Sequence, residues 1–161
     1  MKTMDYRLEQ LRFELQEDPS SRVFFKLGEH LRRVGELDEA IDVLRNGLQS
    51  HPHYVSAWVS LGRALHDQGE SRGAWQAFAK ALEIDPENGV AARCAGEAAI
   101  ANGEWIEAVK NLKRARGMMP QDDTLDERIV FVEERLHELG MLEVKAEPEE
   151  LEGPDEEAEV F

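Results

Sequence analysis

Residues 55–88 read VSAWVSLGRALHDQGESRGAWQAFAKALEIDPEN, and this stretch sets the pattern for most of the chain. Two of its three glycines, one of its alanines and its proline recur 34 residues earlier and 34 residues later. The recurring sets are Gly28, Gly62 and Gly96; Gly35, Gly69 and Gly103; Ala40, Ala74 and Ala108; and Pro52, Pro86 and Pro120. A fixed period of about 20 to 50 residues indicates a repeat architecture, in which each unit packs on its neighbours.

Each recurring position has a physical role, which the central unit illustrates. Gly62 lies in the middle of a predicted helix, where glycine costs about 1 kcal/mol relative to alanine, so it indicates two helices too close for a side chain. Gly69 fits the end of that helix, where the backbone needs a positive φ. Ala74 lets the next helix pack closely, and Pro86 ends it. Each unit is therefore predicted to be a pair of helices joined by a turn.

Apolar residues at helical spacing complete the pattern. The stripes of the first helices are Phe24, Leu27 and Leu31; Trp58, Leu61 and Leu65; and Ala92, Ala95 and Ala99. The second helices share one apolar position, at Leu44, Phe78 and Leu112. The alanine stripe predicts thinner packing in the third unit.

These units resemble the tetratricopeptide repeat. Its signature of Trp, Leu-Gly, Tyr, Ala, Phe and Pro is read here as Trp58, Leu61-Gly62, Leu65, Ala74, Phe78 and Pro86. Only the tyrosine position departs, since Leu31, Leu65 and Ala99 fill it. The resemblance implies an all-α fold, a right-handed superhelical solenoid of about eight helices, and a function in binding other proteins.

Segments outside the repeats are predicted to cap the stack, because an open end would leave an apolar face in water. The expected organisation is an N-terminal capping helix at 1–19, three repeats over 20–121 (approximately 21–54, 55–88 and 89–122) and a C-terminal capping helix at 122–142. The first cap carries Leu8, Leu11 and Leu15 on one stripe, and the second carries Ile129, Val132, Leu136 and Leu139. Gly140 is expected to end the last helix, with Met141 and Leu142 packed beneath it.

Charge is concentrated near the end of the sequence. Residues 143–161 hold nine acidic residues and one lysine, two prolines and no core-forming pattern, which predicts a disordered acidic tail. One lysine minus nine acids gives −8, so −7 of the total of −15 remains for the rest of the chain. Such acidity disfavours nucleic acid and anionic membranes as partners. The charged N-terminus, the lack of a membrane-spanning apolar run and the single cysteine, Cys94, suggest a cytoplasmic protein.

No motif in the sequence indicates catalysis, a cofactor or a metal site. His51 and His53 flank Pro52 in a predicted loop, but no cysteine or carboxylate stands at the spacing of a closed metal site. Cys94 precedes Ala95 of the packing stripe, which favours burial over nucleophilic chemistry. The chain is therefore predicted not to be an enzyme.

In the family that the repeats resemble, the first helices line a concave surface that holds a partner peptide. The family's usual groove positions correspond here to Arg22, Phe25, Glu29, Arg32, Arg33, Ser56, Val59, Arg63, His66, Asp67, Val90, Arg93, Glu97, Ile100 and Ala101. Five arginines against three acids would make this surface basic, which suits an acidic peptide with apolar anchors. The alternative is a neutral mosaic, in which these arginines balance neighbouring acids.

The resemblance also indicates one class of ligand that this chain is not expected to bind. Domains of this family that grip the C-terminal carboxylate of heat-shock chaperones share lysine, asparagine and arginine residues at five positions. Those positions are occupied here by Phe25, Glu29, Ser60, Val90 and Cys94, so that ligand is not expected.

Several functions within this class remain open. The first is an adaptor or scaffold that binds one protein partner, with self-association through the ends of the solenoid as a further possibility. The second is a small secretion-type chaperone that holds an exported or assembling protein, and the third is a regulatory module of an enzyme. The chain's own acidic tail is a candidate occupant of the groove, and a merely solubilising tail is the alternative.

Overall fold

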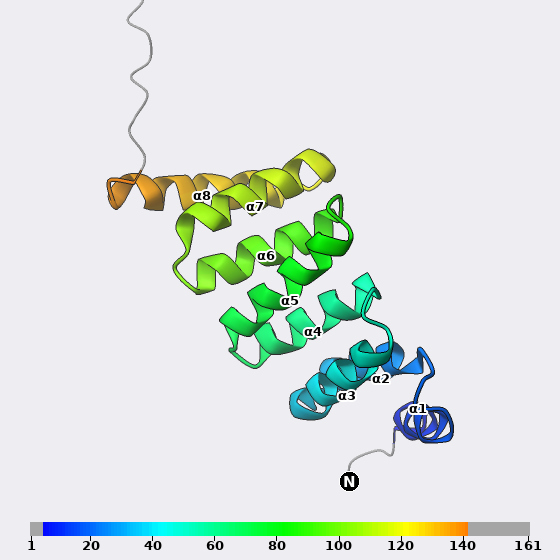
Figure 1. The fold of residues 1–161 in the computed structure, drawn as a ribbon. Helices are drawn as coiled ribbons and strands as arrows, with labels where there is room; N and C mark the ends of the chain where they lie inside the picture. The colour runs from blue at the N-terminus through cyan, green and yellow to red at the C-terminus, as the bar shows by residue number, and fades with distance from the viewer. Residues whose placement is uncertain (1–4, 142–161) are drawn as a thin grey trace, which may run out of the picture.

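The computed structural model describes residues 5–141. Within that range the chain forms eight α-helices and no strand (Figure 1). Their bounds are α1 Tyr6–Glu17, α2 Val23–Val34, α3 Leu37–Ser50, α4 Val55–Asp67, α5 Ser71–Ile84, α6 Gly89–Ala101, α7 Trp105–Met118 and α8 Thr124–Glu138. The all-α prediction is confirmed, whereas the predicted acidic tail at 143–161 lies outside the described residues.

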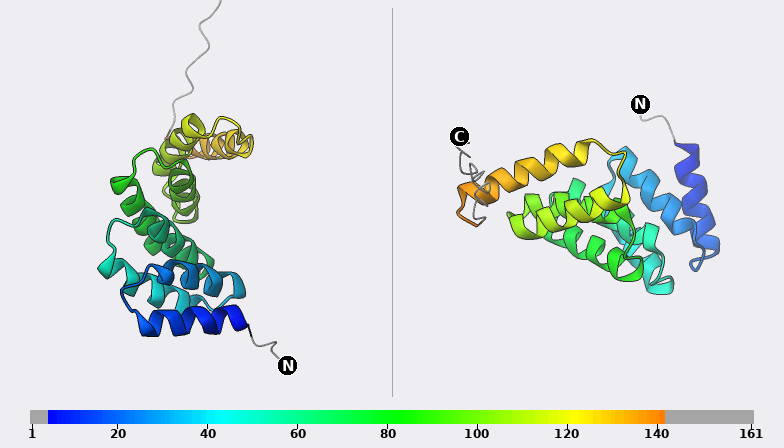
Figure 2. Two further views of the ribbon diagram at one scale, coloured as in Figure 1. Left: turned by 90° about the vertical axis from the view of Figure 1, so that its right-hand side faces the viewer. Right: turned by 90° about the horizontal axis from the view of Figure 1, so that it is seen from above.

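The helices form a curved stack of pairs. Helix α2 packs on α3, α4 on α5 and α6 on α7, and each pair contacts the next through α3 with α4 and α5 with α6. The first helices also contact one another, α2 with α4 and α4 with α6. At the two ends of the stack α1 lies on α2 and α8 lies on α7 (Figure 2). One face of the stack is therefore built from the first helices of successive pairs.

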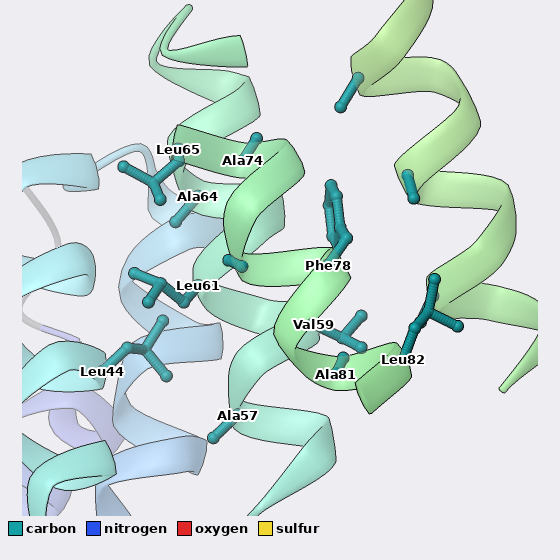
Figure 3. Close-up of a cluster of buried hydrophobic side chains, with 14 of the residues drawn as sticks. Leu44, Ala57, Val59, Leu61, Ala64, Leu65, Ala74, Phe78, Ala81 and Leu82 are labelled. Atoms are coloured by element: carbon teal, nitrogen blue, oxygen red, sulfur yellow. The ribbon is translucent and has the colours of Figure 1, made fainter. Parts of the chain in front are cut away.

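The glycines in the middle of the first helices allow the close packing that their spacing predicts. A Cβ atom at Gly62 would lie 2.4 Å from Cε1 of Phe78, closer than two carbon atoms can approach. Figure 3 shows Phe78 of α5 directed into the space between the helices. The same relation recurs in the other pairs, where Gly28 faces Leu44 and Gly96 faces Leu112.

The second set of glycines ends the first helices as predicted. Gly35, Gly69 and Gly103 have φ angles of 88°, 89° and 73°, a conformation that side chains disfavour. The backbone N–H of the next residue then donates to a carbonyl of the last helical turn, as from Glu70 to Leu65 at 2.8 Å. The turn between the helices of each pair is thereby fixed.

A continuous apolar core follows the predicted stripes. The side chains of Phe24, Leu27 and Leu31, and those of Ala92, Ala95 and Ala99, are at most 1% exposed. Trp58 was expected on the same stripe but is only half-buried, because its indole N–H donates to the carbonyl of Pro52 at 2.8 Å near the surface. Leu8 and Leu11 of α1 join the core.

The predicted packing of the C-terminal cap is partly wrong. Val132 and Leu136 are buried, but Leu139 is 48% exposed and Met141 is 50% exposed. Helix α8 ends at Glu138, and Gly140, with a φ of 66°, turns the chain so that the N–H of Met141 caps the carbonyl of Leu136. Leu139 and Met141 both follow the last residue of α8 and lie outside its buried face. Leu125, which the predicted stripe omitted, is buried instead, and Leu142 lies outside the described residues.

Candidate binding groove

Three neighbouring pockets follow the face built by the first helices. The N-terminal pocket, of about 270 Å³, is lined by Arg7, Leu11, Phe25, Lys26, Glu29, His30 and Arg33. The central pocket, of about 350 Å³, is lined by Phe25, Glu29, Ser56, Val59, Ser60, Arg63, Asn88 and Val90. The C-terminal pocket, of about 480 Å³, is lined by Arg63, His66, Asp67, Phe78, Arg93, Cys94, Glu97, Thr124, Leu125 and Arg128.

These pockets form one continuous groove. Phe25 and Glu29 belong to both the N-terminal and the central pocket, and Arg63 belongs to both the central and the C-terminal pocket. The groove therefore runs from α1, across α2, α4 and α6, to α8. Its length makes it suited to an extended or helical segment rather than to a small compact ligand.

Most of the predicted groove residues line these pockets. They are Phe25, Glu29, Arg33, Ser56, Val59, Arg63, His66, Val90, Arg93 and Glu97, together with Asp67. Arg22, Arg32 and Ile100 line none of the three. Arg22 lies over the ring of Tyr54, 5.5 Å from its centroid, while Ile100 packs against the core.

The central pocket contains an acid that is already paired. The Glu29 side chain is 15% exposed, and its carboxylate accepts from the Nε of Arg32 at 3.4 Å. Burial alone would raise the pKa of Glu29, but hydrogen bonds from the Ser60 hydroxyl and from Arg32 outweigh it and hold the pKa below its usual value. Arg32 also donates to Asp67 at 3.0 Å. Arg32 is thus committed to acids on two helices.

The arginines of the C-terminal pocket are also paired. Arg93 donates to Asp122 at 3.0 Å, and Arg128 donates through two nitrogens to Glu97, one of these bonds being 2.8 Å long. The pKa of Asp122 is lowered, chiefly by the hydroxyl of Thr124 and then by Arg93. These pairs join α6 to α8 and its N-terminal turn. At its centre and C-terminal end the groove therefore fits the neutral mosaic, in which arginines balance neighbouring acids, better than the predicted basic surface.

Arg63 differs from these neighbours. It lines two pockets and forms no ion pair with another described residue. It is close enough to Glu29 to contribute to lowering the pKa of that carboxyl. Its guanidinium is the part of the predicted basic groove that remains available in the middle.

Sequence reasoning missed several residues that line the groove at its two ends. Arg7 of α1 and Lys26 and His30 of α2 line the N-terminal pocket, and Arg128 of α8 lines the C-terminal one. The family's positions were applied only to the three repeats, so α1 and α8 were left out. Leu125 lies 34 residues after the buried Ala91, and continuing the period would have placed α8 as a further first helix.

The candidate chemical residues are placed as follows. His51 packs on Phe24 and its Nε2 lies 2.7 Å from the carbonyl oxygen of Ser20, while His53 is exposed. Cys94 was expected to be buried but is half-buried, because it lines the C-terminal pocket beside α8. Across residues 5–141 no group of three or more His, Cys, Asp or Glu side chains is arranged to hold a metal. None of the helices α1 to α8 is long and apolar enough to cross a membrane.

Comparison with known proteins points to a repeat family. The family model described as "Tetratricopeptide repeat" matches residues 25–89. Small glutamine-rich tetratricopeptide repeat-containing protein 2 of Mycosarcoma maydis is 32% identical over 74 residues, covering 45% of this chain and 21% of that protein. ALBINO3-like protein 3, mitochondrial, of Arabidopsis thaliana is 31% identical over 100 residues, covering 55% and 18%. The chain thus spans about a fifth of the length of these two relatives.

Solved structures agree on the fold. A crystal structure of MamA superposes with a TM-score of 0.76 at 19% identity, covering 83% of this chain and 77% of that one. The first tetratricopeptide repeat domain of Spaghetti (RPAP3), bound to the HSP90 peptide SRMEEVD, superposes with a TM-score of 0.71 at 19% identity, covering 74% and 94%. With the repeat spacing, the helix pairs and the family model in agreement, residues 25–89 match the tetratricopeptide repeat and residues 5–141 fold as a solenoid of that kind.

Proposed function

We propose that the chain is a non-catalytic adaptor or scaffold whose groove binds an extended or helical segment of another protein. The observation that carries this proposal is the continuity of the groove, since its three pockets share Phe25, Glu29 and Arg63. A surface of this shape suits a segment that contacts several pockets in turn. A cytoplasmic location is part of the proposal and rests on the composition alone.

The central pocket supplies apolar contacts for such a segment. Phe25 is half-buried, Val59 is 7% exposed and Val90 is 42% exposed, and all three line this pocket. Ser60 and Asn88 add polar groups beside them. We propose that one or two apolar side chains of the partner anchor here, with acidic residues next to them. The polar, ion-paired walls elsewhere favour an adaptor over a chaperone for apolar segments.

Partner capture with a matched pair of variants tests the proposal. Val90→Glu changes an exposed valine in the central pocket, and Ile106→Glu changes an isoleucine of α7 that is 53% exposed and lines none of the three pockets. Both add one negative charge at a surface position. Proteins retained from native extract by the full chain should be lost with Val90→Glu and kept with Ile106→Glu. Retention of the same proteins by both variants would place the binding surface elsewhere.

The acidic segment at 143–161 forms part of this proposal as a competitor for the groove. Its nine acids and its apolar residues resemble the partner that we propose. A chain ending at Gly140 should then retain more of the same partner than the full chain does. Equal retention by the two chains would leave this segment without a role in the groove.

A further inference from the structure

The N-terminal pocket, between α1 and α2, gathers cations that the repeat pattern does not account for. Lys26 and Arg33 stand seven residues apart on α2, hence on one helix face, with His30 between them. Arg7 reaches the same pocket from α1. From this arrangement we infer an anion-binding subsite, built by Arg7, Lys26 and Arg33, that takes the carboxylates of an acidic segment of the partner protein.

The three cations are not committed to acids within residues 5–141. Lys26 forms no ion pair there, and the guanidinium of Arg7 donates to the neutral amide of Gln10 at 3.1 Å. Arg33 is 72% exposed on its side chain and lies 4.0 Å from Glu29, at the outer limit of an ion pair. All three side chains are therefore free to turn toward a ligand in the pocket.

The acids beside the pocket already have hydrogen-bond partners. Glu29 is held by Arg32 and the Ser60 hydroxyl. Asp5 caps α1, because one of its carboxylate oxygens accepts hydrogen bonds from the backbone N–H groups of Arg7 and Leu8. Its other oxygen is hydrogen-bonded to the ring of His30. These bonds hold the pKa of Asp5 below its usual value, the His30 bond being the largest cause. Both acids stay ionised, but the pocket lining holds three cations, Arg7, Lys26 and Arg33, against the single acid Glu29, so positive charge remains in excess.

Several arginines elsewhere along the stack are paired with acids. Arg12 donates to Glu39 at 2.8 Å, Arg93 to Asp122 at 3.0 Å and Arg116 to Asp126 at 2.6 Å. By contrast, Arg7 and Lys26 form no ion pair within residues 5–141 and Arg33 has only its 4.0 Å contact with Glu29, so three cations that line one pocket repel one another. A carboxylate-rich ligand relieves that repulsion and gains charge-assisted hydrogen bonds. The net charge of −7 outside residues 143–161 makes nucleic acid an unsuitable source of the anion.

The position of the subsite also gives the ligand a direction. Phe25 lines both this pocket and the central one, so an apolar residue bound near Val59 and Val90 would lie next to carboxylates bound near Lys26. At the other end, Arg93 and Arg128 of the C-terminal pocket are already paired with Asp122 and Glu97. The acidic part of the partner therefore lies over α1 and α2 rather than over α6 and α8. This inference rests on the proposed function and adds the location and chemistry of one subsite.

Two labelled peptides test the subsite, one of consecutive glutamates ending in phenylalanine and the other with glutamine in place of each glutamate. Both are titrated by fluorescence anisotropy into the full chain. They are also titrated into a full-length variant in which every acidic residue from 143 onward is changed to its amide, so that the chain's own acids do not compete. The glutamate peptide should bind more tightly than the glutamine peptide, and its affinity should fall as salt is raised.

Matched triple variants locate the binding. Arg7→Gln, Lys26→Gln and Arg33→Gln together should weaken the glutamate peptide by roughly tenfold, as expected for three exposed charge contacts. Arg45→Gln, Arg72→Gln and Lys80→Gln remove the same charge from exposed positions on α3 and α5 that line none of the pockets, and they should change the affinity less than about twofold. Circular dichroism verifies that both triples are folded.

An equal loss in the two triples would overturn the inference, because only net charge would then matter. The absence of any preference for the glutamate peptide in both full-length proteins would overturn it as well. Neither result bears on whether Val90→Glu abolishes partner capture. The subsite and the proposed function are therefore tested independently.

Discussion

The ring of Phe78 occupies the space that a side chain at Gly62 would need. The Cβ of an alanine at this position would lie 2.4 Å from Cε1 and 2.7 Å from Cδ1 of that ring, and Phe78 is itself 2% exposed. Glycine in the middle of a helix costs about 1 kcal/mol relative to alanine, and overpacking a core costs about 1–3 kcal/mol. At this position the packing cost is the larger of the two.

We therefore expect Gly62→Ala to lower the free energy of unfolding by about 1 kcal/mol. Gly117 of α7 has no atom within 4 Å of the place where its Cβ would be, so Gly117→Ala should leave stability unchanged or raise it by up to about 1 kcal/mol. Urea denaturation of the two variants measures the difference. A gain in stability for both would show that α4 and α5 are not held at the distance that the glycine allows.

Helix α8 is the element whose packing differs most from the sequence-based prediction. Its inner face consists of Leu125, Val132 and Leu136, each at most 1% exposed. Two ion pairs also join α8 to earlier helices: Arg128 pairs with Glu97 of α6, and Asp126 pairs with Arg116 of α7. Since an open solenoid end exposes an apolar face, these contacts make α8 the C-terminal lid of the stack.

Leu136 and Leu139 test this account of α8, since they are the same residue type in the same segment. Leu136→Ala removes a side chain that is 1% exposed and should cost about 2–5 kcal/mol of unfolding free energy. Leu139→Ala removes one that is 48% exposed and should change stability by less than about 0.5 kcal/mol. Similar losses from both substitutions, measured by urea denaturation, would mean that α8 continues to pack beyond Glu138.

The contrast between these two leucines shows how far sequence predicts structure in this chain. Spacing alone predicted the helix pairs, the close approach at Gly62 and the turn at Gly69, because each depends on local backbone geometry or on the repeat itself. Whether Leu139 is buried depends on where α8 ends. A stripe of apolar residues that continues past the end of the helix does not show where that end lies. Helix ends are decided by local capping, here at Gly140.

The charges of the groove were harder to predict for a different reason. Arg32 and Asp67 are 35 residues apart in sequence, as are members of successive first helices, and Arg93 and Asp122 are 29 apart. A count of charges at predicted groove positions assumes that each arginine has no partner. In the folded stack, acids of the next unit lie close enough to form ion pairs with these arginines. The N-terminal pocket was missed because it needs the placement of α1 against α2, which no repeat position describes.

At the scale of the whole molecule, the groove belongs to no single repeat. Its pockets take residues from α1, α2, α4, α5, α6 and α8, and the curved stack aligns them on one face (Figure 2). Its charge differs along its length: Arg7 and Lys26 form no ion pair within residues 5–141 at the α1 end, whereas Arg93 and Arg128 are paired at the α8 end. A partner segment is therefore expected to bind in one direction only.

Site-specific photo-crosslinking tests most directly whether this groove is the binding surface. A benzophenone side chain replaces Ser56, which is exposed in the central pocket, or Asn46, which is exposed on α3 and lines none of the pockets. After irradiation in native extract, we predict that the captured partner is crosslinked from position 56 and not from position 46. Crosslinking of the same partner from position 46 but not from position 56 would contradict the account.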